Sequence, residues 1–313
     1  MAKIAPILCA TCLVILAVGA ASRPQSESRE SLPPVYFNHS DLVVDPSAYD
    51  AIAQSQFLKE EFAHVTETTV RRSADQTVTG LVIEGRRTYL SIFKTGSMVL
   101  PNQPAPEGQV NFNMWIDDRT KLPLIRDSLA RTTHTDARLS QISRAFQSRI
   151  VAPFDVVAPS YPDSADVRAR STVISRNLEV FRLLYPDLSP SQYGTTREIG
   201  QLISNRYLPE LLMNDVTRFT VVVSHAELAR LQETFEGYGY ALRREGDRWV
   251  VTGPEIEFVL IPAADPGLQR RIAVELKLNR AYAGDPLHTF GAGSEIELHR
   301  DTATWRFPAG WHP

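Results

Sequence analysis

The sequence predicts an α+β fold in which short helices alternate with runs of strands. The 313 residues have an ordinary globular composition, with 43% hydrophobic and 22% charged residues, which excludes collagen-like and fully disordered chains. A β-α-β-β-β order of elements is predicted near both ends of the chain. Its last three strands follow one another without helices between them, which favours mixed sheets over a doubly wound parallel sheet.

The chain begins with an apolar segment that is typical of a secretory signal peptide. Lys3 precedes an almost unbroken apolar run over residues 4–19, which ends in small residues suited to signal peptidase. We therefore expect residues 1–20 to be a cleaved leader, although a run of this length could also stay as an N-terminal anchor. The expected location is periplasmic or extracellular, with no membrane association beyond export.

Both cysteines of the chain, Cys9 and Cys12, lie inside this leader. The mature chain is therefore expected to have no thiol, no disulfide and no thiolate metal site. Residues 21–34 are rich in Ser, Arg, Glu and Pro, so a flexible tether is expected there. The formal charge of −3 and the scattered arginines indicate no nucleic-acid partner.

An N-terminal folded region is expected over residues 35–137. It opens with a strand over residues 35–44, and Asp45-Pro46 is typical of the helix start that follows. A later strand over residues 110–116 leads into a second helix, in which Leu122, Ile125 and Leu129 share one face. The strands expected after the first helix cover residues 64–71, 77–83 and 87–94.

The middle of the chain is less regular. Residues 138–215 contain several prolines, which break the hydrophobic pattern, and one helix is expected over residues 195–213. We expect an irregular helical insertion or linker over residues 138–215.

A C-terminal module is expected over residues 216–308. A strand over residues 218–223 ends at Ser224, and Glu227 completes a capping box for the next helix. Leu228, Leu231 and Phe235 lie on one face of that helix. The strands expected after it cover residues 238–244, 248–252, 255–262, 272–279, 295–299 and 303–307.

Parts of these two regions resemble a known superfamily. Tyr36-Phe37-Asn38-His39, the helical stretches 45–52 and 57–62, and the strand over residues 88–93 are similar to a poorly characterised group of glyoxalase-like bacterial proteins. That group is related to the vicinal oxygen chelate superfamily, which includes glyoxalases and extradiol dioxygenases. The resemblance, which covers residues 35–94 and 215–308, implies curled mixed sheets built from repeated βαβββ modules.

The resemblance also implies a metal site. In the superfamily, the first strand of each module tends to supply a histidine and the last strand a glutamate, which together hold a divalent metal. His39 stands at the first-strand position here, and Ser91 stands at or beside the last-strand position. In the C-terminal module Arg218 or Phe219 replaces the histidine, whereas Glu255 and Glu257 are available on the last strand. His39 and Glu257 are thus candidate metal ligands, fewer than the usual three or four.

A small-molecule site is expected beside His39. This histidine is either a metal ligand or general base that faces a cavity, or a strand histidine that bonds to the backbone. Tyr89, Ser91, Asn113 and Trp115 are expected to line the same sheet-lined cleft, because aromatic surfaces with a few polar groups are typical of ligand sites. The sequence identifies no catalytic residue.

Three functions follow from these observations. The first is an exported glyoxalase-like protein that binds a small molecule in this cleft and has an incomplete metal site. The second is a metal-dependent lyase, isomerase or dioxygenase of the vicinal oxygen chelate type. The third is a cell-envelope scaffold that contacts another protein through residues 138–215.

Overall fold

The computed structural model describes residues 31–71, 77–97, 99–100, 103–146, 149–160, 167–184, 186, 207–264, 270–308 and 311. The expected leader and all but the last four residues of the expected tether lie outside this part of the chain. From Leu32 onward the described residues belong to one compact unit. None of the helices within them is long and apolar enough to cross a membrane.

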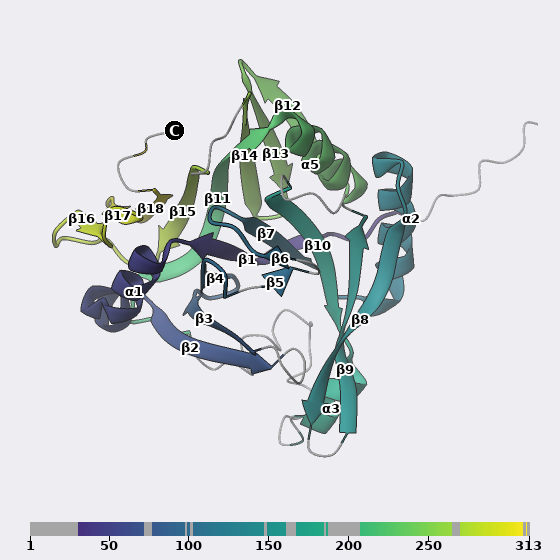
Figure 1. Cartoon of the computed structure of the whole chain (residues 1–313), viewed down its shortest axis with the longest axis horizontal. Coiled ribbons are helices and arrows are strands. Elements are labelled where there is room, and N and C mark those ends of the chain that lie inside the picture. The colour runs from purple at the N-terminus through teal and green to yellow at the C-terminus, as the bar shows by residue number, and fades with distance from the viewer. Residues whose placement is uncertain are drawn as a thin grey trace, which may run out of the picture. The chain divides into compact units, whose positions relative to one another are not determined.

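The first eight-stranded sheet consists of two βαβββ modules side by side, in the order β2-β3-β4-β1-β7-β10-β9-β8 (Figure 1). Within each module the first and last strands pair in parallel, and β1 pairs with β7 antiparallel. The elements of the first module are β1 (Tyr36–Val44), α1 (Pro46–Gln54), η1 (Leu58–Phe62), β2 (His64–Arg71), β3 (Thr77–Glu84) and β4 (Tyr89–Lys94). Those of the second are β7 (Val110–Trp115), η2 (Arg119–Lys121), α2 (Leu122–Thr133), β8 (Ala137–Phe146), β9 (Arg149–Pro159) and β10 (Ala169–Arg176). The short strands β5 (Val99–Leu100) and β6 (Gln103–Pro104) pair separately.

The expected irregular insertion over residues 138–215 is wrong for most of the residues that the structure describes there. Strands β8, β9 and β10 occupy this range, and among its described residues the short helix α3 (Leu178–Leu184) and the start of β11 (Met213–Ser224) follow them. Two of the prolines that suggested an irregular segment fit inside β9. Pro153 lies at a register shift between β8 and β9, and Pro159 ends the strand, which are positions where a missing N–H is tolerated. Residues 195–206 of the expected helix lie outside the described residues, and Met213 begins a strand.

The second eight-stranded sheet repeats this strand order as β12-β13-β14-β11-β15-β18-β17-β16. Its first module contains β11 (Met213–Ser224), α5 (His225–Gly237), β12 (Ala241–Glu245), β13 (Arg248–Gly253) and β14 (Ile256–Ala263). The expected C-terminal module therefore holds a fourth unit as well, formed by β15 (Ile272–Leu278), β16 (Leu287–Thr289), β17 (Glu295–Leu298) and β18 (Thr302–Phe307). This fourth unit has no helix, and β15 and β18 run antiparallel because parallel pairing requires a crossover. The predicted class, α+β with repeated modules in mixed sheets, is confirmed.

The two sheets also share a detail of register. Strands β1 and β11, which begin the two sheets in the sequence, each shift in register against their antiparallel neighbour. The shift ends at His39 in β1, and a shift in β11 ends at Arg218. Across the parallel pair, His39 then stands opposite Tyr89 of β4, and Arg218 stands opposite Glu257 of β14. His39 and Arg218 therefore occupy equivalent positions in the two sheets.

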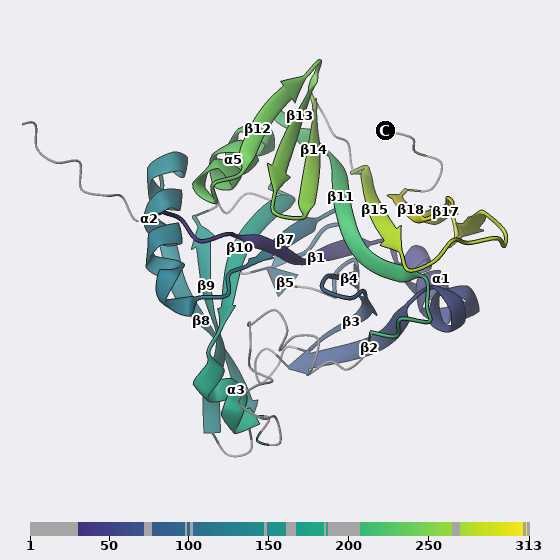
Figure 2. The ribbon, with the colours of Figure 1, turned by 180° about the vertical axis from the view of Figure 1, so that it is seen from behind.

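One hydrophobic core joins the sheets. The ring of Phe37 in β1 lies 5.2 Å from that of Phe219 in β11 and 6.2 Å from that of Phe258 in β14, and Phe112 of β7 contacts the same two rings. Helix α2 packs on β8 and β9 and also contacts α5 (Figure 2). The residues predicted to form the apolar helix faces, Leu122, Ile125, Leu129, Leu228, Leu231 and Phe235, are all buried. Since strand side chains alternate, the other face of each sheet points away from this core.

Candidate functional site

The candidate site lies on the face of the first sheet that points away from the shared core. Strand register places three predicted site residues in one row on this face: Tyr89 of β4, His39 of β1 and Asn113 of β7. Thr172 of β10 continues the row. The strand register therefore brings three of the predicted ligand-binding residues together, and their contact with a ligand stays a prediction.

A second row lies two residues further along the same strands. It contains Ser91 of β4, Asp41 of β1 and Asn111 of β7, and it continues through Val82 of β3 to Thr66 of β2. We call the two rows together the polar face. Its polar members are Tyr89, His39, Asn113, Thr172, Ser91, Asp41, Asn111 and Thr66, together with Glu84 and His64, which continue the first row, and Arg170, which stands opposite Asn111.

Apolar clusters separate from the main core border the polar face at both ends. At one end Trp115, which the sequence also predicted, packs with Val156 and Ile174. The guanidinium of Arg176 lies over the Trp115 ring, with its Cζ atom 4.6 Å from the ring centroid. This is a cation–π contact. The cluster at the other end consists of Val43, Val78, Ala105 and Phe93.

His39 is held by contacts on both sides of its ring. Nδ1 lies 2.8 Å from Asn38 Oδ1, an atom that only accepts, so this contact fits the tautomer with its proton on Nδ1. The ring stacks on Tyr89 with the centroids 4.3 Å apart. Burial lowers the pKa of His39 to about 4, with the charge of Asp41 opposing this shift and that of Arg176 adding to it. The imidazole is therefore neutral at pH 7.

Asp41 begins a chain of hydrogen bonds along the polar face. Asn113 Nδ2 donates to Asp41 Oδ2 at 3.1 Å, and Thr172 Oγ1 donates to Asn113 Oδ1 at 3.0 Å. The other carboxylate oxygen, Oδ1, lies 3.8 Å from His39 Nε2. These bonds hold the amide of Asn113 in one orientation and leave Asp41 Oδ1 and His39 Nε2 as neighbouring acceptors.

Several buried polar atoms on this face find no hydrogen-bond partner among the described residues. They are Oδ1 of Asn111, Oγ1 of Thr66, and both amide atoms of the fully buried Gln109. Gln109 belongs to the same face because its backbone pairs with Val43. An unpaired buried polar group costs about 1–3 kcal/mol, and such groups in native proteins usually meet water or a ligand. The sequence analysis missed these three residues, although Asn111 lies two residues from Asn113.

Glu257 does not lie near His39, so the predicted metal site shared by these two residues is wrong. Glu257 is on the outer face of the second sheet, where Arg218 Nε donates to its Oε1 at 2.6 Å. Arg218 Nη1 also donates to Glu275 Oε1 at 2.8 Å. The adjacent Phe258 points into the shared core, so the core separates Glu257 from His39. The alternation of side chains along a strand predicts which residues of that strand share a face. It does not predict which of the two sheets the strand belongs to.

The residues present do not fit a complete metal centre. No group of three or more His, Cys, Asp or Glu side chains that could hold a metal occurs in the part of the chain that the structure describes. On the polar face His39, Asp41, Glu84 and His64 are typical ligand types, but no three of these described residues form a group that could hold one metal. Two protein ligands fall short of the three or four that hold most divalent transition metals.

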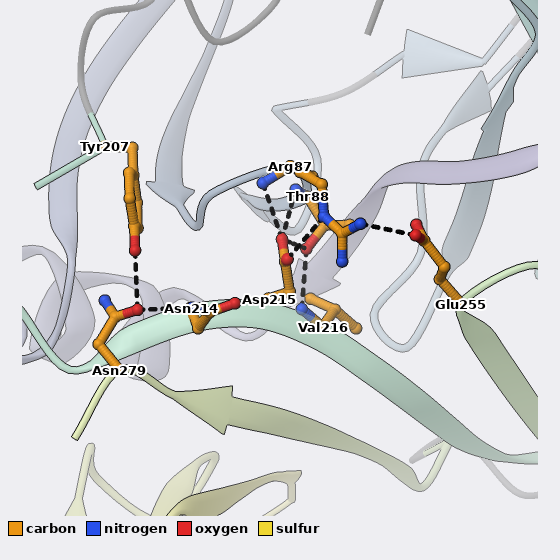
Figure 3. Close-up of polar contacts among 8 residues, drawn as sticks. All are labelled: Arg87, Thr88, Tyr207, Asn214, Asp215, Val216, Glu255 and Asn279. Atoms are coloured by element: carbon orange, nitrogen blue, oxygen red, sulfur yellow. Dashed lines mark hydrogen bonds and ion pairs between the residues drawn. The ribbon is translucent and has the colours of Figure 1, made fainter. Parts of the chain in front are cut away.

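A second polar cluster joins the two sheets (Figure 3). Asp215 Oδ1, at the start of β11, accepts from the backbone N–H groups of Arg87 at 2.7 Å and Thr88 at 3.1 Å. Arg87 Nε donates to Asp215 Oδ2 at 3.0 Å, and Nη1 donates to Glu255 Oε1 at 2.6 Å. Thr88 Oγ1 accepts from the backbone N–H of Val216 at 2.8 Å. We call these five residues the joint.

The joint keeps Arg87 charged. Burial alone would lower the pKa of its guanidinium, but the hydrogen bond and charge of Asp215, together with Glu255, raise that pKa overall. Nearby, Tyr207 and Asn214 both donate to Asn279 Oδ1, at 2.7 and 2.6 Å (Figure 3). No sequence motif indicated this cluster, because its members come from distant segments of the chain.

The protein is of the α+β class, with repeated βαβββ modules in two mixed sheets. A family model matches residues 37–307, and the chain belongs to that family, the family of unknown function DUF5829. The comparison with curated proteins found no match.

Three solved structures illustrate what the chain is similar to. A hypothetical protein from Staphylococcus aureus has 9% identity and a TM-score of 0.44, covering 73% of this chain and 86% of that one. A xylose isomerase-like TIM barrel/4-hydroxyphenylpyruvate dioxygenase fusion protein has 10% identity and a TM-score of 0.40, covering 75% and 34%. A glyoxalase I mutant from Zea mays has 9% identity and a TM-score of 0.32, covering 74% and 68%. At these TM-scores the fold assignment rests on strand order and pairing alone.

Proposed function

We propose that this protein is exported and binds a small, uncharged, polar molecule on the polar face of the first sheet. The observation that carries the proposal is the set of buried atoms with unmet hydrogen-bonding capacity on Asn111, Thr66 and Gln109. They lie on the same face as the hydrogen-bonded chain Asp41–Asn113–Thr172. A polar ligand that reaches these groups would satisfy their hydrogen-bonding capacity.

The chemistry of the polar face favours a hydroxyl-bearing or amide-bearing ligand. Amide side chains offer both donors and acceptors, and His39 is neutral at pH 7 because burial depresses its pKa to about 4. The carboxylate of Asp41 would repel an anion placed beside it. The ring of Tyr89 provides apolar surface on this face, as is typical of small-molecule sites, whereas the ring of Trp115 is buried at its border.

The variant Asn111→Leu tests this proposal with D-glucose and its anionic counterpart D-gluconate as probes. We expect the wild-type protein to bind the neutral probe more tightly than the anion, and the variant to lose at least tenfold in affinity. Isothermal titration calorimetry measures the affinity of each protein for each probe. The free variant should be as stable as wild type or more so, because Asn111 Oδ1 has no partner to lose.

The exposed Ser140→Ala variant on β8 serves as the control and should bind as wild type does. If neither probe binds, or if Asn111→Leu binds as tightly as Ser140→Ala, the proposed ligand class is wrong.

Metal removal provides a second test of the same site. Since His39 and Asp41 offer two ligands, we expect the purified protein to contain less than one equivalent of divalent metal and to keep its melting temperature after treatment with EDTA. Elemental analysis and differential scanning fluorimetry check this. Stoichiometric metal that disappears in His39→Ala would instead favour the metal-dependent lyase, isomerase or dioxygenase.

Export is the remaining part of the proposal, and it rests on the apolar run over residues 4–19. Sequencing the N-terminus of the protein recovered from outside the cytoplasm should give a chain that begins near residue 21. Recovery of intact Met1 would contradict cleavage.

A further inference from the structure

We propose that a cavity at the joint between the two sheets binds a small oxyanion, a carboxylate, phosphate or sulfate. This site is distinct from the polar face, and its evidence is independent of the function proposed above. The cavity has a volume of about 110 Å³. Side chains from both sheets line it, among them Arg86, Arg87, Thr88, Thr217, Glu255 and Lys277.

The size of the cavity limits its occupant to a few heavy atoms. One water molecule needs roughly 10–15 Å³ measured in this way, whereas sites for drug-sized ligands begin at about 300 Å³. A cavity of about 110 Å³ lies between these limits, and a tetrahedral or planar oxyanion fits that range.

The acidic groups that line the cavity are already engaged. Asp215 is 4% exposed, and its two carboxylate oxygens accept from two backbone N–H groups, the hydroxyl of Thr88 and Nε of Arg87. Glu255 accepts from Arg87 Nη1. Arg87 thus donates to both carboxylates (Figure 3). Hydrogen-bond donors within the joint therefore hold the oxygens of both acidic groups.

Two cations at the cavity have no such engagement. Arg86 and Lys277 are exposed, and neither forms an ion pair with a carboxylate of the described residues. Together with Arg87 they make three cationic side chains beside two carboxylates, so the cavity has an excess of positive charge. Guanidinium and ammonium groups are the usual protein partners of oxyanions.

The two cations come from different sheets. Arg86 lies in the turn between β3 and β4 of the first sheet, and Lys277 lies on β15 of the second. At the same turn, the backbone N–H of Arg86 donates to the carbonyl oxygen of Asn214 at 2.5 Å. An oxyanion that contacts both cations would therefore link the two sheets beside the backbone hydrogen bond that already connects them. Such a ligand stabilises the folded state by mass action.

Urea unfolding of the full-length protein in inorganic phosphate, against sodium chloride at equal ionic strength, tests the proposal. We expect phosphate to raise the urea midpoint in a saturable way and to show exchange broadening in ³¹P NMR spectra. Arg86→Gln and Lys277→Gln should each weaken phosphate binding about tenfold. The matched control Arg138→Gln removes an exposed arginine on β8 and should leave binding unchanged.

Two results would overturn the proposal. One is the absence of phosphate-specific stabilisation. The other is an equal, non-saturating rise in wild type and in the Arg86→Gln/Lys277→Gln double variant, which would identify a general salt effect. Asn111→Leu should respond to phosphate as wild type does, so failure at the polar face and failure at the joint are distinguishable.

Discussion

At the residue that follows the register shift in each first strand, the two sheets carry different chemistry. His39 is a neutral imidazole beside the single carboxylate of Asp41. Arg218 is a permanent cation between Glu257 and Glu275, and their charges and hydrogen bonds raise the pKa of its guanidinium although burial opposes this. The first sheet thus retains free acceptor atoms at this position, whereas in the second sheet the equivalent groups satisfy one another.

The depressed pKa of His39 predicts a pH-dependent loss of stability. Between its ordinary value of 6.5 and its folded value of about 4, the unfolded chain binds a proton that the folded chain does not. The free energy of unfolding therefore falls as the pH drops through this window, and the loss is complete below pH 4. For one histidine this amounts to at most about 3 kcal/mol.

Urea unfolding at pH 7 and at pH 4.5 measures this loss in wild type and in His39→Gln, which cannot titrate in this range. We expect the variant to lose less stability than wild type on acidification, since every other titrating group is common to both proteins. Equal losses in the two proteins would show that His39 is not held neutral by the fold.

Much of the polar face could be predicted from the sequence because strand residues two apart share a face. His39 and Asn113 were placed on strands by pattern, and Asp41 and Asn111 each lie two residues from one of them. Spacing alone could therefore have included these two. The role of Gln109 could not be predicted, since it depends on complete burial and on a backbone pairing with Val43 just before the start of β7.

At the scale of elements, Glu227 connects three segments of chain. It completes the capping box of α5 with Ser224, and its carboxylate accepts from the backbone N–H groups of Arg168 and Ala169 at the start of β10. Both carboxylate oxygens also accept from Arg270 Nη2 at 2.7 Å, just before β15. Both of the paired side chains are 1% exposed. Burial tends to raise the pKa of Glu227, but Arg270 and the hydrogen bonds lower it overall.

Removing this carboxylate should be far more destructive than removing the cap itself. Glu227→Ala leaves Arg270 buried and unpaired, so we expect a loss of about 3–5 kcal/mol in the free energy of unfolding. The matched variant Ser224→Ala removes only the capping hydroxyl and should cost about 1 kcal/mol. Urea unfolding of both variants checks the ratio. Similar losses would mean that the capping box, and not the buried ion pair, is what Glu227 supplies.

Element boundaries could be predicted where local chemistry was strong, and the errors have a common cause. The capping box and the apolar faces of α2 and α5 are properties of single segments. Strands β8 to β10 were missed because Pro153 and Pro159 suggest breaks when strand pairing is unknown. The fourth module was missed because it lacks a helix, so its strands give no βαβββ pattern.

At the scale of the whole molecule, the shared core predicts that the sheets unfold together. Phe37 and Phe112 of the first sheet contact Phe219 and Phe258 of the second, and the joint adds Asp215 to these contacts. We expect a single transition in differential scanning calorimetry, with equal calorimetric and van't Hoff enthalpies. Asp215→Ala should reduce the free energy of unfolding by about 2–3 kcal/mol. The midpoint temperature of the transition should therefore fall, and the transition should stay single. Two resolved transitions would show that the sheets fold independently.

The missing helix of the fourth module has a consequence for how the chain folds. In the other three modules the first and last strands pair in parallel, so a crossover connection must link them. Bringing the ends of such a long connection together costs conformational entropy. Strands β15 to β18 need no crossover, and their antiparallel pairing depends on contacts closer in sequence. Contacts of that kind form fastest. Of the four modules, the fourth is therefore the one whose first and last strands can pair earliest.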